Sequence, residues 1–185
     1  MKISSAALKA KRSCASGYRW FARRFKSPAE YQSVIDALVA DGRVDDACWL
    51  LDQFGPIESV LVLDAISADA FVFAGWVQVR GDVDMESSVR TGGSLRAGGS
   101  IRSGMHIDAG WGIVAGSDIT CDGAIRAGEC IVSGGVIRTG AGFNLYAGLS
   151  ARRDAWPSCG RVISRERPEN LLSGVWDCGS CEVLA

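Results

Sequence analysis

Large apolar residues recur at every sixth position through the middle of the chain. The step is kept without an exception or an insertion at Val77, Val83, Val89, Leu95, Ile101, Ile107, Ile113, Ile119, Ile125, Ile131, Ile137, Phe143 and Leu149. Two positions after each large residue a small one is usual, and the next position is glycine in most repeats and Asp122 in one. The two-residue spacing places the large and small side chains on one face of a short strand. The glycine or aspartate then predicts a corner with a positive φ angle.

A single repeat of six residues can bury only a narrow strip of apolar surface. Stacked coils bury a continuous column, so the pattern from Phe71 to Leu149 predicts a solenoid. The pattern resembles the hexapeptide-repeat β-helix families, in which three repeats make one triangular coil. The expected fold class is mainly β: a triangular parallel β-helix (hexapeptide solenoid) with a small α-helical N-terminal cap and a C-terminal β cap. Those families usually place the large residue directly before the small one, and this chain does not, which leaves the handedness open.

If three repeats make a coil, as that resemblance implies, the residues that follow each large residue form three outward ladders. They consist of Arg90, Asp108, Arg126 and Asn144; of Arg96, Val114, Val132 and Ser150; and of Arg102, Thr120 and Arg138. The first ladder alternates in charge, which predicts ion pairs worth roughly a few tenths of a kcal/mol each. The second is an outward apolar strip, which predicts a binding surface. Its candidate interaction residues are Arg96, Val114, Val132 and the corner residue Trp111.

The segments on either side of the repeat predict caps. Residues 1–55 are expected to form a helical head: Ser27-Pro28-Ala29-Glu30 has the spacing of a capping box, which predicts a helix from Pro28 to Gly42. A second helix is expected from about Asp45 to Gly55. Short strands at 60–63 and 71–73 lead into the solenoid, assigned to residues 56–149. Residues 150–185 predict a C-terminal cap made of strands.

Charge is distributed unevenly, although the whole chain is nearly neutral. Residues 1–29 hold eight basic residues and no acid, whereas residues 30–88 hold twelve acids against Arg43 and Arg80. The favoured interpretation is that the two segments pack together and neutralise each other. The alternative is that interleaved arginines and aromatics bind nucleic acid. The candidate interaction residues of the head are Arg19, Trp20, Arg23, Arg24 and Trp49.

Length and composition exclude several classes of protein. No stretch approaches the roughly 18 apolar residues that a membrane span needs, and the N-terminus lacks the apolar segment of a signal peptide. Seven cysteines without a secretory signal predict reduced thiols and a cytoplasmic protein.

Candidate chemistry is sparse. Hexapeptide β-helices are often acyltransferases with a histidine as general base, and related zinc enzymes need three histidine ligands. This chain has one histidine, His106, at a corner, and its repeats predict no loop excursion. Cys178 and Cys181 form a single C-x-x-C near the terminus, and no other catalytic motif is present. The expectation is therefore a protein that is not an enzyme and that needs no cofactor or metal.

Three features resemble a group of phage and prophage hexad-repeat proteins, mostly of unassigned function. They are the opening Cys14-x-x-Gly17-x-x-Trp20-Phe21, the helix containing Trp49-Leu50-Leu51, and the run Ala109–Ile113. The polymer-forming β-helix proteins of the bacterial cytoskeleton are a more distant resemblance. The closer resemblance implies an origin in a mobile element and action inside a bacterial host cell.

The leading hypothesis is a non-enzymatic protein-binding solenoid that engages a host protein or complex. The specific form of this hypothesis is an inhibitor of a host defence complex, for example an anti-CRISPR. It would act by surface occlusion or by imitating nucleic-acid charge with the acid-rich stretch Asp41–Glu86. The alternatives are a self-assembling structural scaffold and, third, a hexapeptide-repeat acyltransferase. A homo-oligomer is possible under each hypothesis, and no membrane partner is expected.

Overall fold

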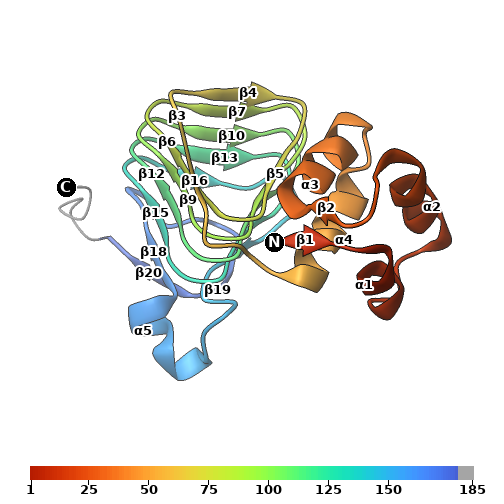
Figure 1. Cartoon of the computed structure of the whole chain (residues 1–185). Helices are drawn as coiled ribbons and strands as arrows, with labels where there is room; N and C mark the ends of the chain where they lie inside the picture. Colours follow the sequence, from red (N-terminus) through yellow and green to blue (C-terminus); the bar gives the residue numbers. More distant parts are fainter. Residues whose placement is uncertain (179–185) are drawn as a thin grey trace.

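The computed structural model describes residues 1–178 and shows a helical head beside a parallel β-solenoid (Figure 1). The head contains four helices and one short antiparallel strand pair, β1 with β2. Their bounds are β1 Lys2–Ile3, α1 Ser5–Ala10, α2 Ala15–Arg24, β2 Ala29–Glu30, α3 Tyr31–Ala40 and α4 Val44–Phe54.

Three parallel sheets form the sides of the solenoid within the described residues, which confirms the mainly β, β-helical fold class. The seven-stranded sheet contains β3 Val60–Leu63, β6 Trp76–Val79, β9 Leu95–Ala97, β12 Ile113–Ala115, β15 Ile131–Ser133, β18 Arg161–Ile163 and β20 Val175–Asp177. The six-stranded sheet contains β5 Phe71–Phe73, β8 Val89–Thr91, β11 Ile107–Ala109, β14 Ile125–Ala127, β17 Leu145–Tyr146 and β19 Leu171–Ser173. The five-stranded sheet contains β4 Ile66–Ala68, β7 Val83–Met85, β10 Ile101–Ser103, β13 Ile119–Cys121 and β16 Ile137–Arg138.

The core of the solenoid is a column of stacked aliphatic side chains. Strand partners are three repeats apart, as in Ile101 with Ile119 and Ile113 with Ile131. Every large residue of the six-step series from Val77 to Ile137 is buried. The predicted inward positions and the predicted coil of three repeats are confirmed over this range.

The six-step series does not continue inward to Phe143 and Leu149, and that prediction is wrong. Their side chains are 43% and 53% exposed. After β16 the chain turns at Gly142, where φ is +81°, and Leu145 takes the inward place opposite Ile125 that the repeat assigns to Phe143. The predicted ladder places of Asn144 and Ser150 are therefore taken by Tyr146, opposite Arg126, and Ile163, opposite Val132.

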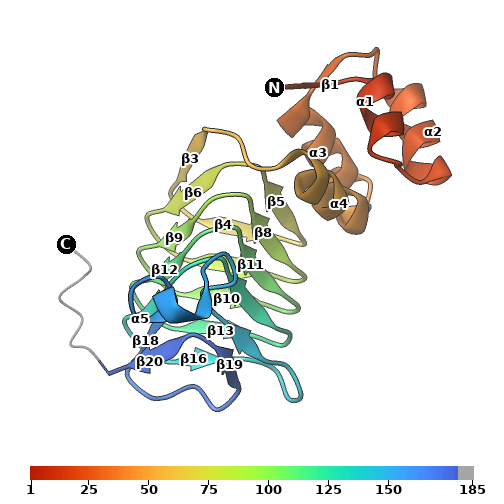
Figure 2. The same ribbon diagram turned by 90° about the horizontal axis from the view of Figure 1, so that it is seen from below.

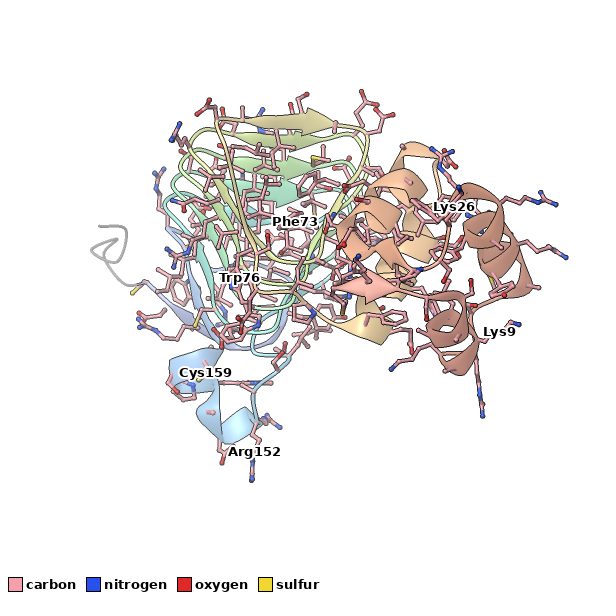
Figure 3. The ribbon with its side chains drawn as sticks, viewed as in Figure 1. Lys9, Lys26, Phe73, Trp76, Arg152 and Cys159 are labelled. Carbon is pink, nitrogen blue, oxygen red and sulfur yellow. The ribbon has the colours of Figure 1, made fainter. Side chains whose placement is uncertain are left out.

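An excursion leaves the solenoid between β17 and β18, although the unbroken repeat predicted none. Residues 147–160 hold a 3-10 turn at Arg153–Ala155 and the short helix α5, Trp156–Cys159. The indole N–H of Trp156 donates to the carbonyl oxygen of Gly148 at 3.2 Å, which ties the base of the excursion together. Figure 3 shows Arg152 and Cys159 on this projection. The chain then re-enters the solenoid, and β18, β19 and β20 extend two of the sheets in parallel.

The corner glycines have a different cause from the predicted one. None of the glycines that follow the small residues has a positive φ angle. Instead, a Cβ at Gly98 or Gly134 would lie closer than 3.0 Å to a carbonyl oxygen of the coil before. The glycines are therefore required because the backbones of successive coils approach closely. At Asp122 the requirement moves one residue along, because Gly123 is the crowded position there.

The head packs on the first coil of the solenoid through α3 and α4, which contact β5. The amide of Gln32 binds the edge of β5 like an additional strand: its nitrogen donates to the carbonyl oxygen of Val72 at 3.1 Å, and its oxygen accepts from the N–H of Ala74 at 2.9 Å. Val72 and Ala74 belong to the apolar core of the head. Figure 2 shows the head beside β5, with β3 and β4 farther from it.

The predicted capping box is wrong. Ala29 and Glu30 pair with Ile3 and Lys2 as strands, and α3 begins only at Tyr31. The Ser27 hydroxyl accepts from the N–H of Ser5, so it serves the start of α1 and not its own helix. The second predicted helix is confirmed as α4, which ends at Gly55 with φ at +77°.

Among residues 1–178, no helix has both the length and the apolar character needed to cross a bilayer.

Candidate binding surfaces

The structure separates the candidate interaction residues into two groups on different parts of the molecule. Arg19, Trp20, Arg23 and Arg24 lie on α2 of the head, whereas Arg96, Val114 and Val132 form one ladder of the seven-stranded sheet. Trp111 lies at the corner that leads into β12 and is 47% exposed. Trp49 is half-buried in the head and packs on its core.

The ladder of Arg96, Val114 and Val132 lines a shallow hollow of about 360 Å³. The excursion forms one wall through Ser158, and the thiol of Cys130 donates to the carbonyl oxygen of Ser158 at 3.6 Å. Because Val132 is only 9% exposed, its side chain is already covered by this chain. The apolar strip predicted from the ladder is thus half-buried at Val114 and covered at Val132.

A second exposed apolar surface of this sheet lies at its other end and was missed by the sequence analysis. Val60 and Val62 of β3 are 64% and 49% exposed, and they lie beside Trp76 and Gln78 of β6 in register. The ring of Trp76 packs against that of Trp111, with ring centres 6.1 Å apart. Figure 3 labels Trp76 on the solenoid. The alternation in Val60-Leu61-Val62-Leu63 was the available signal, since it places both valines on one face.

Strand β3 is also an open edge. Within residues 1–178 it pairs with β6 alone, as the last strand of its sheet. The N–H of Trp76 donates to the carbonyl oxygen of Ser59, and the N–H of Arg80 donates to the carbonyl oxygen of Leu63. The carbonyl oxygens of Ser59 and Leu63 therefore point toward β6. Because backbone groups alternate along a strand, the N–H and C=O groups of Val60 and Val62 point to the open side. Such an edge can accept another strand.

The second group surrounds Trp20 on the outer face of α2. The indole N–H of Trp20 donates to Asp41 at 2.7 Å, and Arg24 pairs with the same carboxylate at 3.4 Å. The guanidinium carbons of Arg24 and Arg43 lie 6.0 and 5.9 Å from the Trp20 ring centre. Arg43 comes from the turn before α4 and forms an ion pair with Asp46. Sequence analysis missed this role of Arg43, because it depends on how the turn packs on α2.

The acid-rich stretch is partly neutralised within the molecule. Five of its acids have partners: Asp41 with Arg24, Asp46 with Arg43, Asp52 with Arg90, Asp64 with Arg80, and Asp82 with the N–H of Ser100. Asp41, Asp46 and Asp52 lie on the head, whereas Asp64 and Asp82 lie in successive coils at the corner between the seven-stranded and five-stranded sheets. The paired acids are thus divided between two parts of the molecule.

A charged network connects the head to the six-stranded sheet. Asp52 of α4 pairs with Arg90, and Asp108 lies between Arg90 at 4.0 Å and Arg126 at 3.7 Å. The predicted alternating ladder is therefore present at these three positions. Burial raises the pKa of the Asp108 carboxyl, and the two arginines only partly offset this effect.

The raised pKa of Asp108 predicts a pH-dependent contribution to stability. Folded Asp108 holds its proton more tightly than unfolded Asp108, so this site's contribution is largest below about pH 4 and decreases as the pH rises through the raised pKa. Urea unfolding of the wild type and Asp108→Asn should show the wild type losing stability relative to the variant between pH 4 and pH 7. The control is Asp84→Asn, which removes a carboxylate that is exposed to solvent. A difference that grows in favour of the wild type toward pH 7 would contradict the prediction.

The side chain of His106 joins two successive coils of the solenoid. Its Nδ1 accepts from the N–H of Ala124 in the next coil at 3.0 Å, and its ring lies edge-on to Phe143 at 5.8 Å. Asp82 and Asp118 occupy equivalent corners and accept in the same way from Ser100 and Val136. His106 is thus one of several side chains that join successive corners.

Two of the cysteine thiols are shielded from solvent, Cys48 partly and Cys121 almost fully. Burial raises the pKa of Cys48 and Cys121 to about 11, so few of these thiols ionise at neutral pH. The described residues contain no cluster of three or more His, Cys, Asp or Glu side chains that could hold a metal ion. Cys178 is exposed, and Cys181 lies outside the described residues.

A partly open cavity of about 150 Å³ lies in the head, beside Leu8, Phe21 and Leu50. This volume is below the roughly 300 Å³ at which small-molecule pockets usually begin. We therefore interpret it as a gap in packing. The hollows beside α2 and on the seven-stranded sheet are larger, at about 520 and 360 Å³, and both are open to solvent at charged side chains.

Comparison with known proteins adds one finding. Residues 1–54 match the family described as the YdhT N-terminal domain. The match ends at the last residue of α4, where the head gives way to the solenoid. No curated protein and no solved structure matches the chain.

Proposed function

We propose that this chain is a non-enzymatic, protein-binding solenoid whose main binding face is the outer side of the seven-stranded sheet. One observation carries the proposal: exposed and partly exposed apolar side chains gather at one end of this sheet, beside the open edge of β3. They are Val60, Val62, Trp76 and Trp111. Contiguous exposed apolar surface on a folded protein usually marks an interaction site.

The open edge suggests how a partner binds. An extended segment of the partner would add to β3 as a further strand, using the free backbone groups of Val60 and Val62. Apolar side chains of that segment would then contact the two valines and the tryptophan pair. Backbone pairing supplies affinity in this mode, and the side-chain contacts supply specificity.

The resemblance to phage and prophage hexad-repeat proteins supports a mobile-element origin. Under this proposal the partner is a host protein, and a host defence complex such as a CRISPR–Cas effector is the most specific version. The internal pairing of Asp41, Asp46 and Asp52 favours surface occlusion over nucleic-acid mimicry. The absence of catalysis remains part of the proposal, supported by the structural use of His106.

Site-specific photo-crosslinking in a bacterial host tests this function. A photoreactive residue at Gln78, exposed on β6 beside Val62, is expected to give one discrete crosslinked product. The same residue at Arg102, exposed on the five-stranded sheet, is the matched control and should give none. Val62→Lys, which keeps the fold but places a charge on the face, should abolish the Gln78 product. Equal labelling from both positions, or none from Gln78, would refute the assignment of this face.

A self-assembling scaffold is the second candidate, and the same open edge favours it. A second copy could occupy β3, because the strand contains no charged residue or proline that would discourage pairing. Light scattering of the purified protein separates the two functions. A molar mass that stays constant across concentrations, together with the Gln78 product, supports a binding protein. A mass that grows with concentration and becomes constant in Val62→Lys supports the scaffold.

A further inference from the structure

The outer face of α2 carries a basic stripe that the mechanism of partner binding proposed above does not use. Ser16, Arg19, Trp20, Arg23 and Arg24 follow one another at spacings of three, one, three and one residues, so they share one face of the helix. Together with Asp41 and Arg43 they line the open hollow of about 520 Å³. Four arginines against one aspartate leave this hollow positively charged.

The inner and outer parts of this stripe differ in how far they are neutralised. Arg24 pairs with Asp41, and Arg43 pairs with Asp46. Arg19 and Arg23 are exposed and have no ion pair within residues 1–178. They lie four residues apart, which is about 6 Å along the helix axis. The packing predicted to neutralise the basic segment therefore supplies an ion-pair partner to Arg24 and none, within residues 1–178, to Arg19 and Arg23.

The head carries further exposed cations. They are Lys9, Lys11, Arg12 and Lys26, and none forms an ion pair within the described residues. Figure 3 labels Lys9 and Lys26 on the head, and Figure 1 shows α1 and α2 on the side of the head away from the solenoid. Residues 1–54 hold nine basic and six acidic residues, whereas the remainder holds eleven and fifteen. The head is thus the cationic end of a chain that is close to neutral.

We propose that this face of α2 binds the phosphate backbone of a nucleic acid, with Arg19 and Arg23 as the main contacts. Guanidinium groups match phosphate oxygens in both charge and geometry. The ring of Trp20 lies close to two guanidinium groups, and its N–H is bonded to Asp41. Because Trp20 is already engaged within the protein, binding relies on phosphate contacts and not on stacking with a base. Such contacts position a nucleic acid without reading its sequence.

A nucleic acid fits this surface better than a lipid bilayer. Helices that lie on membranes insert an apolar face beside their basic one. The apolar side of α2 is buried, with Phe21 in the core of the head and the ring of Phe25 packed on those of Trp20 and Phe21. Met1 is the large apolar residue that the described head leaves mostly exposed. The charged face thus has no apolar surface to insert.

Fluorescence anisotropy with a labelled DNA of mixed sequence and about 30 nucleotides, single-stranded and as a duplex, tests the proposal. Non-specific binding of this kind has a Kd of roughly 1–100 µM near physiological salt. If three cations contact phosphates of the single strand, affinity should fall about 20-fold between 50 and 200 mM salt. The double variant Arg19→Ala/Arg23→Ala should reduce that dependence to about threefold. Arg19→Lys/Arg23→Lys should keep the wild-type dependence, because the charges remain.

The matched control is Arg102→Ala/Arg138→Ala, which removes two exposed arginines of the five-stranded sheet and gives the same net charge. It should leave binding unchanged. Arg23 also lies in the last turn of α2, where a basic residue stabilises the helix, so thermal melts must show that each variant is folded. Absence of binding at 50 mM salt, or an equal loss in the control, would overturn the proposal. Binding to phosphatidylglycerol vesicles without binding to DNA would overturn it in favour of a membrane contact.

Discussion

Replacing Ile119 with aspartate is expected to unfold the solenoid. Ile119 is fully buried in β13, and it pairs with Ile101 on one side and Ile137 on the other. These neighbours are aliphatic and offer no hydrogen bond or counter-charge to a carboxylate. The variant must bury an unpaired charge or protonate it, and either outcome costs several kcal/mol. We expect a loss of about 5 kcal/mol or more, which exceeds the whole stability of many domains.

Circular dichroism with thermal and urea unfolding measures this effect. Ile119→Val removes one methylene from the same site and should cost about 0.5–1.5 kcal/mol. Arg102→Ala changes an exposed, outward residue paired with Thr120 in the adjacent strand, and it should change stability by less than about 0.5 kcal/mol. An Ile119→Asp protein that melts close to the wild type would show that the inward assignment is wrong.

The stacked column is the part of the fold that the sequence predicts best. A coil of three six-residue repeats places every sixth residue in the same environment, so the apolar series from Val77 to Ile137 specifies strands, register and core together. The same series cannot show where the solenoid changes. Phe143 and Leu149 keep the six-residue step, yet Gly142 turns the chain and Leu145 takes the buried place. An apolar residue at the right interval is buried only if the backbone keeps its path.

The repeat predicts which residues of a candidate surface share a ladder, but not which of them other segments cover. Arg96, Val114 and Val132 share a ladder because the register follows from the repeat. The covering of Val132 could not be predicted, since it depends on the excursion at residues 147–160. Arg43 is similar: its contact with Trp20 depends on the turn between α3 and α4 and not on any local pattern.

The helical head illustrates how local signals can be overridden. Ser27, Pro28 and Glu30 fit the capping rules for a helix, but β1 offers a strand partner to Ala29 and Glu30. Strand pairing satisfies the backbone groups of both segments, whereas a longer helix would leave Lys2 and Ile3 unpaired. This pairing holds Ile3 fully buried in the apolar core of the head.

The corner glycines differ in how closely the neighbouring coil approaches them, and the most crowded ones should tolerate no side chain. At Gly116 an added Cβ would lie 2.9 Å from the carbonyl carbon of Gly98 and closer still to its oxygen. The backbone of Gly98 belongs to the preceding coil, so it can move away only if the two coils separate. At Gly112, four residues earlier, an added Cβ would meet the carbonyl oxygen of Cys130 at 3.2 Å, which a small shift accommodates. The two glycines therefore differ in crowding, although both lie next to β12.

Gly116→Ala is therefore expected to destabilise the protein by about 3 kcal/mol, because it separates stacked strands on both sides of the corner. Gly112→Ala should change stability by less than about 1 kcal/mol, since its small steric cost is offset by the lower entropy of the unfolded chain. Urea unfolding of the two variants and the wild type gives the comparison directly.

Asp122 shows that a side chain is accepted at this position of the repeat when a glycine follows it, here Gly123. The double change Gly116→Asp/Ser117→Gly should accordingly recover part of the stability lost in Gly116→Ala. Equal losses in Gly116→Ala and Gly112→Ala would mean that glycine is needed at corners for backbone freedom and not for close stacking.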